Sequence, residues 1–403
     1  MYAVPVALTI NPTASHMSNM QSSVIDSLRS FAKMNTCEIE AKNDVDRVNT
    51  IRVFLDKLFN AANPATFNQI SLLCPFVYHN LKDFQSRGEV PDEVLDPLKR
   101  GYYQTASSNL LKLNAATKIF KALQQEDILA IPLKGIALVE TLYKNPAIRP
   151  MTDIDLLVKT DDFQRIKDVL ESIGYRLTDS YRGSYNFADE KNRVLLDLHS
   201  KFLRYEILFR IDDAEIYKRL CNINFNDQVL IRVLCPEHQL VHIALHLAPG
   251  LYSDLNIINL LDLYLMLSNR EHSIDWEYLV DFAERSGISS YMYAPLMLCS
   301  ELFNVSIPQF VLPSLGCRLS PGKNSYIQNH YLTSILNGSG NGSKIVFERL
   351  VWAEGVPARL KLIRMALFPD RREMADRYHI PEKSARLYGL YAVRLWKLLR
   401  NKT

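Results

Sequence analysis

The sequence has few of the features that mark several common classes of protein. Only 6 cysteines occur in 403 residues, and none forms a Cys-x-x-Cys pair, so neither a disulfide framework nor a zinc-ligand pattern is indicated. Glycine is scarce, with 14 residues, and no apolar run reaches the roughly 20 residues that a membrane-spanning helix needs. These absences predict a cytoplasmic protein with reduced thiols and no membrane partner.

The remaining composition is typical of a globular protein. Hydrophobic residues make up 48% of the chain and charged residues 23%, which is sufficient for a large core. The length predicts two or three domains. We expect a polar, flexible leader at residues 1–21, a helical region at 22–126, an α/β core at 127–213, and a mainly helical region at 214–403 with a flexible Gly/Ser loop at 337–343.

Charge is unevenly distributed along the chain. The net charge is +3, yet residues 344–403 contain 14 lysines and arginines against 6 acidic residues. Such a basic segment could attract RNA or another phosphate-bearing partner. We favour the simpler explanation that these residues form the solvated face of amphipathic helices, because they alternate with apolar residues.

Hydrophobic periodicity predicts the order of the elements. An apolar helical stripe comprises Leu110, Leu111, Leu113, Ala116, Ile119, Phe120 and Leu123. A compact α/β unit follows, with strand 128–133, a helix ending at 143, strand 153–158, helix 161–173, and strands 175–177, 185–188 and 193–199. The chain then becomes helical again, at 238–247, 255–267, 276–286 and 291–303.

Three aspartates on two of these strands carry the chemical information. Asp153 and Asp155 are two residues apart, so a strand places both side chains on one face. Asp197 lies between leucines in the apolar run VLLDLH, where an unpartnered carboxylate is costly to bury. If the two strands pair, the three carboxylates converge, and a cation must neutralise them.

Carboxylate oxygens select hard cations. We therefore predict Mg²⁺, with Mn²⁺ as a substitute, because Mg²⁺ retains waters that a substrate phosphate can displace. Two such ions held by shared aspartates would stabilise the attacking and leaving oxygens of an in-line phosphoryl displacement.

Residues near the first aspartates could bind phosphate. Lys134 and Gly135 follow the first strand and open a helix, where a glycine and a helix N-terminus favour anions. Arg149 is a second candidate, because guanidinium suits phosphate geometry. The hydroxyl of Thr152 could donate a hydrogen bond to a phosphate. The simpler alternatives are an ordinary strand-to-helix turn at Lys134 and the start of a strand at Thr152.

The motifs LKGIALVETLY, IRPMTDIDLLV and VLLDLH together resemble an uncharacterised bacterial nucleotidyltransferase family of the DNA polymerase β-like superfamily. The resemblance covers roughly residues 100–300. It implies that Asp153 and Asp155 bind both metal ions, while Asp197 binds one and helps to deprotonate the acceptor. One departure from the superfamily is Ile136, which stands where a second small residue usually contacts the triphosphate.

Histidines give weaker signals. His199 shares a strand face with Asp197 and could orient substrate or a metal-bound water, or simply be a hydrogen-bonded histidine. His238, His242 and His246 are spaced by four and share a helical face, which is compatible with a metal site, but no further ligand completes the set. The alternative is that only His246 faces the active-site cleft.

The sequence therefore predicts an α+β protein. A small mixed-sheet nucleotidyltransferase core would be flanked by N-terminal helices and a C-terminal helical region. It would move a nucleoside monophosphate from ATP or another nucleoside triphosphate to a small molecule, a peptide or protein, or RNA, and release pyrophosphate. Open alternatives are a kinase-like transfer, a nucleotide-binding scaffold without catalysis, and a helical interaction protein.

Overall fold

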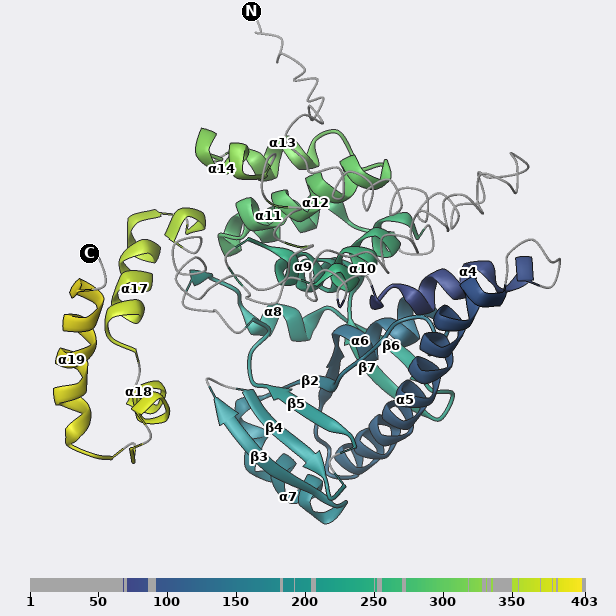
Figure 1. Cartoon of the computed structure of the whole chain (residues 1–403), viewed down its shortest axis with the longest axis horizontal. Coiled ribbons are helices and arrows are strands. Elements are labelled where there is room, and N and C mark those ends of the chain that lie inside the picture. Colours follow the sequence, from purple (N-terminus) through teal and green to yellow (C-terminus); the bar gives the residue numbers. More distant parts are fainter. Residues whose placement is uncertain are drawn as a thin grey trace, which may run out of the picture.

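Figure 1 shows the computed structural model of the protein, with ribbons coloured along the sequence. It describes residues 68, 71–85, 92–181, 184–191, 193–203, 208–249, 251, 256–269, 273–317, 319–327, 331, 335, 350–353, 355–369, 371–378, 380–381 and 383–400. The predicted leader at 1–21 and the predicted loop at 337–343 lie outside the described residues.

In the described part of the chain, two helices precede the sheet. α4 (Cys74–Gln85) packs against α5 (Asp92–Gln125), which is 34 residues long. The apolar stripe of α5 is narrower than predicted, because Leu110 and Leu111 are exposed. The positions that meet the sheet recur every three or four residues, as one helical face requires. They are Leu113, Ala116, Ile119, Phe120 and Leu123.

The α/β core follows in the predicted order. It comprises β1 (Ala130–Leu133), α6 (Lys134–Leu138), the π-helical turn η2 (Val139–Tyr143), β2 (Ile154–Val158), the 3-10 turn η3 (Thr160–Asp162), α7 (Phe163–Ser172), β3 (Tyr175–Tyr181), β4 (Ser184–Asp189) and β5 (Leu195–His199). The strand order is β1-β2-β5-β4-β3. β2 and β5 are parallel, and the other neighbouring pairs are antiparallel.

The two faces of this sheet pack against different parts of the molecule. Ile154 and Leu156 of β2 join an apolar core with Phe120 of α5. Leu157 points the opposite way, into a larger core built mainly by the later helices. Because side chains alternate along a strand, Asp155 lies on the same side as Leu157. The carboxylate thus faces the boundary between the sheet and the helical region.

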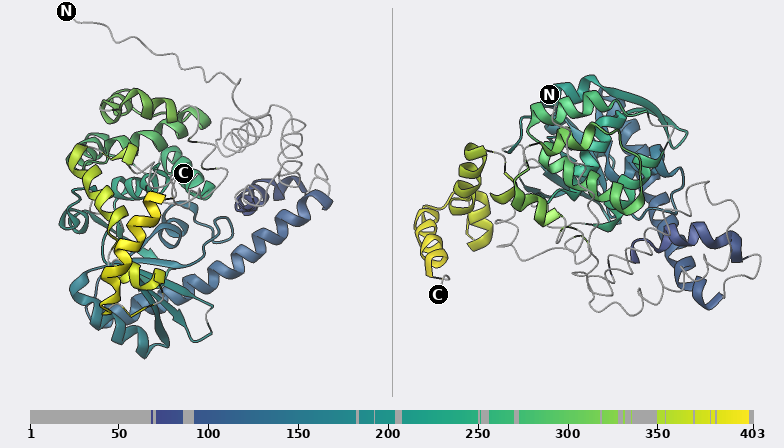
Figure 2. Two further views of the ribbon diagram at one scale, coloured as in Figure 1. Left: turned by 60° about the vertical axis from the view of Figure 1, so that its left-hand side comes forward. Right: turned by 90° about the horizontal axis from the view of Figure 1, so that it is seen from above.

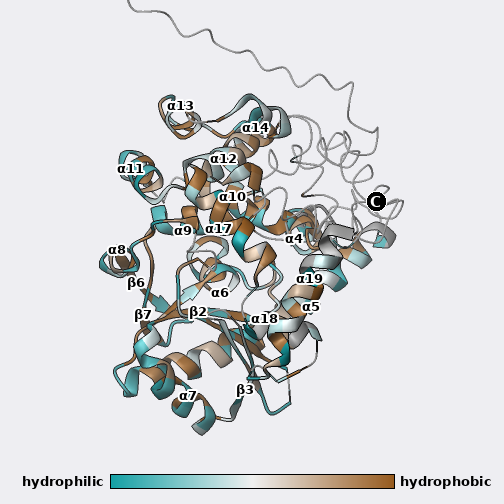
Figure 3. Ribbon diagram, turned by 90° about the vertical axis from the view of Figure 1, so that its left-hand side faces the viewer, coloured by the Kyte–Doolittle hydropathy of each residue, from teal (hydrophilic) through white to brown (hydrophobic). Residues whose placement is uncertain are grey.

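The later helices confirm the predicted helical region. They are α8 (Asp213–Lys218), α9 (Pro236–Leu247), α10 (Ile257–Ser268), α11 (Trp276–Ser286), α12 (Ser289–Phe303), α13 (Val311–Gly316) and α14 (Pro321–Tyr326). Figure 3 shows apolar residues concentrated on α10, whereas α11 at the periphery carries many polar ones. In Figure 1, these helices lie above the sheet and α7 lies below it.

One element of this region was not predicted. β6 (Leu220–Phe225) and β7 (Val229–Leu234) form an antiparallel hairpin that packs beside β1. Its turn includes Asn226 and Asp227, both left-handed, as a tight hairpin turn prefers. The mainly helical region after residue 213 therefore also contains a two-stranded hairpin.

The described residues of the basic C-terminal segment form three helices after residue 354. α17 (Gly355–Leu367), α18 (Arg371–Tyr378) and α19 (Arg386–Arg400) lie to one side of the main body in Figures 1 and 2. α18 and α19 share a small core of Met374, Ala375 and Leu387. The protein thus has the predicted α+β fold. None of the helices among the described residues is long and apolar enough to cross a bilayer.

Candidate active site

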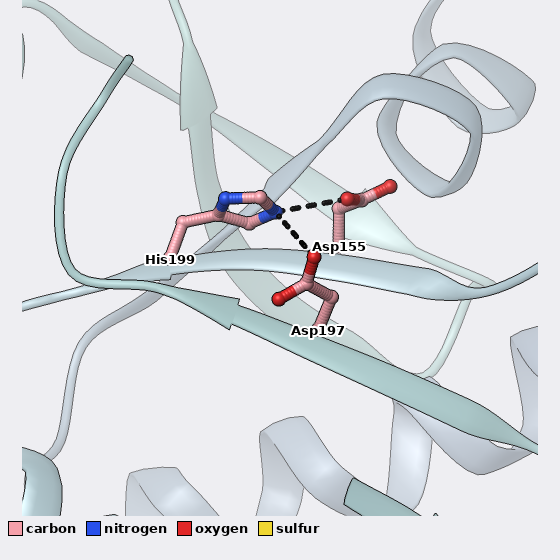
Figure 4. Close-up of side chains that lie close together, drawn as sticks. All are labelled: Asp155, Asp197 and His199. Atoms are coloured by element: carbon pink, nitrogen blue, oxygen red, sulfur yellow. Dashed lines mark hydrogen bonds and ion pairs between the residues drawn. The ribbon is translucent and has the colours of Figure 1, made fainter. Parts of the chain in front are cut away.

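The parallel pairing of β2 and β5 brings two aspartates together. The register places Asp155 directly opposite Asp197, and both residues are buried. His199 lies two residues after Asp197 and projects from the same face of β5. Figure 4 shows the three side chains pointing toward one another. The predicted convergence of carboxylates therefore has a structural basis in the register of these strands.

The contacts within this cluster are short. His199 Nε2 lies 2.9 Å from Asp155 Oδ1 and 3.3 Å from Asp197 Oδ2. Lys134 Nζ donates to the same Asp155 Oδ1 at 2.7 Å. Because carboxylate oxygens only accept hydrogen bonds, Nε2 of His199 carries a hydrogen in this arrangement. His199 thus bridges the two carboxylates, and the charge of Lys134 partly neutralises Asp155.

The pKa values of the two Asp-x-Asp residues are shifted in opposite directions. Burial raises the pKa of Asp155, but the charge of Lys134 and the hydrogen bond from His199 outweigh burial and hold it well below its usual range. The pKa of Asp153 is raised, first by burial and then by repulsion from Asp155. Asp155 is therefore stabilised as an anion, whereas Asp153 has an unfavourable negative charge that a cation would relieve.

Asp153 itself lies just before β2 and is half-buried. Its Oδ1 accepts a hydrogen bond from Thr152 Oγ1 at 2.8 Å, so Thr152 contacts the carboxylate in this structure. The phosphate-binding role predicted for Thr152 stays a prediction.

Two residues near the site were missed by the sequence analysis. Ser184 on β4 is buried and its hydroxyl donates to Asp197 Oδ1. Lys112 on α5 is buried, and its pKa is lowered by burial despite the nearby charge of Asp153. Lys112 Nζ donates to Ser108 Oγ at 2.6 Å. Alternation along β4 could have placed Ser184 on the correct face, but no pattern in the sequence links Lys112 to Asp153.

The turn between β1 and α6 has an unusual backbone. Lys134 is left-handed (φ 47°), which is uncommon for a residue with a long side chain. Gly135 is required for packing, because a Cβ there would lie 2.5 Å from Arg149 Nη1 and 2.7 Å from Met151 Cγ. The glycine thus allows close packing of the loop that leads to β2, in addition to any approach of phosphate.

Arg149 is paired with a carboxylate of the helical region. Its Nε and Nη2 donate to Asp262 Oδ1 and Oδ2 at 2.8 and 2.7 Å, which forms a bidentate ion pair with α10. Both side chains are buried. The structure therefore does not group Arg149 with the Asp155 cluster as a second exposed cation, and its predicted contact with triphosphate stays a prediction.

The three histidines of α9 have separate surroundings. His238 Nε2 pairs with Tyr278 OH at 2.7 Å, whereas the rings of His242 and His246 lie 4.5 Å apart. Burial, followed by the charge of Lys134, lowers the pKa of His246 to about 3. His246 is therefore near the site and neutral. These histidines do not form a metal-binding group among the described residues.

The residues present fit a divalent cation. One ligand atom from each of Asp155, Asp197 and His199 lies within 4.8 Å of the others, the one such group found in the described part of the chain. Two carboxylates suit Mg²⁺, and the added imidazole also suits Mn²⁺. The candidate metal centre thus contains two of the three predicted aspartates, with Asp153 two residues before Asp155.

Comparison with known proteins agrees with this geometry. No curated protein matches the chain significantly. A family model described as an uncharacterised nucleotidyltransferase matches residues 68–304, which is more than half of the 403 residues and includes the sheet, Lys134 and the acidic cluster. The protein therefore belongs to this family of uncharacterised nucleotidyltransferases.

Proposed function

We propose that the protein transfers a nucleoside monophosphate from a nucleoside triphosphate, with ATP as the favoured donor, to an acceptor nucleophile in a reaction that depends on Mg²⁺ or Mn²⁺. In this reaction, an acceptor oxygen or nitrogen attacks the α-phosphorus. The bond between the α-phosphorus and the bridging oxygen to the β-phosphate breaks, and pyrophosphate leaves. The observation that carries this proposal is the direct opposition of Asp155 and Asp197 on parallel strands.

Asp155 and Asp197 would hold the metal, with Asp153 as a third carboxylate and His199 as a ligand or neighbour. The bound ion supplies positive charge to the reacting phosphate. The raised pKa of Asp153 supports this assignment, because burial and Asp155 make its negative charge unfavourable without a cation.

Lys134 is the residue best placed to bind triphosphate. Its side chain is 30% exposed, although its amine reaches the buried Asp155. A lysine has a flexible stem and three donors, so it can exchange one anionic partner for another. Lys134 would leave Asp155 when the metal arrives and would then contact the phosphates.

Asp197 would accept the proton of the acceptor. The Ser184 hydroxyl fixes Oδ1, while Oδ2 is the oxygen 3.3 Å from His199. The serine would therefore orient the carboxylate and present Oδ2 to the acceptor and the ion. The proton would pass to Oδ2 as the new bond to phosphorus forms.

The acceptor class is open among small molecules, peptides or proteins, and RNA. Exposed basic residues on α17 and α19 are compatible with RNA, whose binding would weaken as salt is added. A scaffold that binds nucleotide without catalysis is less consistent with a buried pair of carboxylates, because such a pair is costly to maintain.

The test is a calorimetric titration with a non-hydrolysable ATP analogue, with and without Mg²⁺. We expect binding that requires the metal in the wild type and is lost in the Asp153→Ala/Asp155→Ala variant. Asp168→Asn on α7 is the matched control, because it removes a carboxylate from an exposed helix. Binding that is equally tight without metal would contradict the proposal and favour the scaffold.

A further inference from the structure

The carboxylate of Asp262 is also buried, outside the acidic cluster. Asp262 on α10 is 1% exposed and accepts three hydrogen bonds. Tyr143 OH donates to Oδ1 at 2.7 Å, and the guanidinium of Arg149 donates to both oxygens. The pKa of Tyr143 is raised well above its usual value, first by burial and then by the charge of Asp262, so it remains a phenol donor.

The two partners of Asp262 bracket one segment of the chain. Tyr143 is the last residue of η2, and Arg149 lies in the loop before β2. This segment connects the Lys134–Gly135 turn to the Asp153–Asp155 pair. One carboxylate from the helical region therefore fixes both ends of the link between the proposed phosphate-binding turn and the proposed metal ligands.

The same loop is also held by α5. Asn109 is buried, and its Nδ2 donates to the carbonyl oxygens of Pro146 and Arg149, each at 2.7 Å. Arg149 is thus bonded through its side chain to α10 and through its backbone to α5. A residue fixed at both points has little freedom to change partner.

Arg149 also packs directly against the turn. A Cβ on Gly135 would lie 2.5 Å from Nη1, and Nη1 donates to the Pro150 carbonyl at 3.2 Å. Burial lowers the pKa of Arg149, but the charge and hydrogen bonds of Asp262 outweigh burial and raise it above the usual value. The guanidinium is therefore a permanently charged support that packs against Gly135, with a hydrogen bond from each of its three nitrogens.

We infer that Arg149 and Asp262 are positioning residues for nucleotide binding. They hold the Lys134–Gly135 turn in place relative to the metal ligands and do not contact the nucleotide. This inference rests on the proposed function. Apolar replacement of a buried ion pair often preserves stability, so stability alone does not account for the pair. The geometry of the turn accounts for the pair, because Nη1 of Arg149 occupies the space next to Gly135.

This inference and direct phosphate binding by Arg149 predict different results for one variant. If Arg149 acts as a support, Asp262→Asn weakens nucleotide binding even though Asp262 is buried. If Arg149 were instead a phosphate ligand, Asp262→Asn would release the guanidinium, and nucleotide binding would be kept or strengthened.

The experiment measures binding of a non-hydrolysable ATP analogue with Mn²⁺, and of Mn²⁺ alone, to the full chain. The variants are Asp262→Asn, Arg149→Met and the double variant Arg149→Met/Asp262→Leu, which avoids an unpaired buried charge. The matched control is Asp281→Asn, which breaks the exposed pair with Arg285 on α11. Circular dichroism and melting temperature establish that each variant is folded at the titration temperature.

We expect the double variant to melt within about 5 °C of the wild type, to bind the analogue at least tenfold more weakly, and to bind Mn²⁺ alone within twofold of it. Wild-type affinity in the folded double variant would overturn the inference. So would undiminished binding to Asp262→Asn together with loss in Arg149→Met. If the wild type bound no analogue, the proposed function would fail, and the inference with it.

Discussion

The regions around Asp155 and Asp262 each stabilise a buried carboxylate with a basic side chain, but the two basic side chains differ in their exposure to solvent. Each contains a buried aspartate whose oxygen lies 2.7 Å from a basic side chain. Lys134, the partner of Asp155, is 30% exposed, whereas the Arg149 side chain is 6% exposed. The first ion pair therefore reaches solvent and the second is sealed.

The chemistry of the two cations matches this difference. A lysine is a point charge on a flexible stem, whereas arginine forms a rigid, bidentate pair with a carboxylate. The Asp155 region is thus suited to exchange of its cation for a metal ion. The Asp262 region is suited to holding the chain in one position. Both regions contain a buried aspartate. The solvent exposure of the paired cation distinguishes the candidate active site from the region that holds it in position.

The largest expected effect is on the stability of the sealed pair. Arg149→Met alone leaves Asp262 buried and unpaired, and it should lower the free energy of unfolding by about 3–5 kcal/mol. Urea unfolding monitored by circular dichroism measures this change. A loss below about 1 kcal/mol, the size expected of an exposed pair, would remove the contrast between the two regions.

The next effect concerns the contact that connects the regions. Gly135→Ala places a methyl group 2.5 Å from Arg149 Nη1, and the resulting overpacking should cost about 1–3 kcal/mol. Gly389→Ala in α19 is the matched control, because nothing lies within 4 Å of its Cβ. We expect the control to be neutral or slightly stabilising. Equal thermal shifts in both variants would show that the turn has room for a side chain.

The open pair should respond differently from the sealed one. Lys134→Met should lower the free energy of unfolding by less than Arg149→Met does, because His199 still donates a hydrogen bond to Asp155 after the change. The same change removes a competitor of the metal, so Mn²⁺ without nucleotide should bind about tenfold more tightly, equivalent to about 1.4 kcal/mol. Electron paramagnetic resonance of free Mn²⁺ measures the affinity, with Lys121→Met on α5 as control. Weaker Mn²⁺ binding in Lys134→Met would contradict the proposed replacement of Lys134 by the metal ion at Asp155.

The smallest expected effect is the pH dependence of Asp153. Its folded pKa is raised by burial and by Asp155, so ionisation of Asp153 destabilises the metal-free fold. Stability from this group is present below the unfolded pKa and is lost as pH rises through the folded pKa. Asp153→Asn should therefore be more stable than the wild type at pH 7 in EDTA, and the difference should vanish below the unfolded pKa, at about pH 3. A stabilisation that persists at about pH 3 would show that the effect has another cause.

Local periodicity was sufficient to predict most of the fold and part of the site. Alternation in DIDLLV and VLLDLH placed Asp155, Asp197 and His199 on one side of their strands. Strand-length runs and helical stripes predicted the sheet and helices α9 to α12. The β6–β7 hairpin was missed because its strands stand among strong helical patterns and are only partly buried.

Long-range partners could not be predicted in the same way. Arg149 was expected to bind phosphate because of its position near Asp153, yet its partner Asp262 lies 113 residues later in the chain. Asp262 stands in the apolar run of α10, where no local pattern identifies the cation that accompanies it. Which of two nearby basic residues is sealed and which reaches solvent depends on tertiary packing alone.

The most direct test of the central claim is Mn²⁺ binding to the Asp155–Asp197 pair in the presence of a non-hydrolysable ATP analogue, followed by electron paramagnetic resonance. We compare the wild type with Asp155→Asn, Asp197→Asn and the Asp168→Asn control. We predict that the wild type and the control bind the ion and the analogue together, while both site variants lose at least tenfold in affinity. Unchanged Mn²⁺ binding in Asp155→Asn and Asp197→Asn would contradict it.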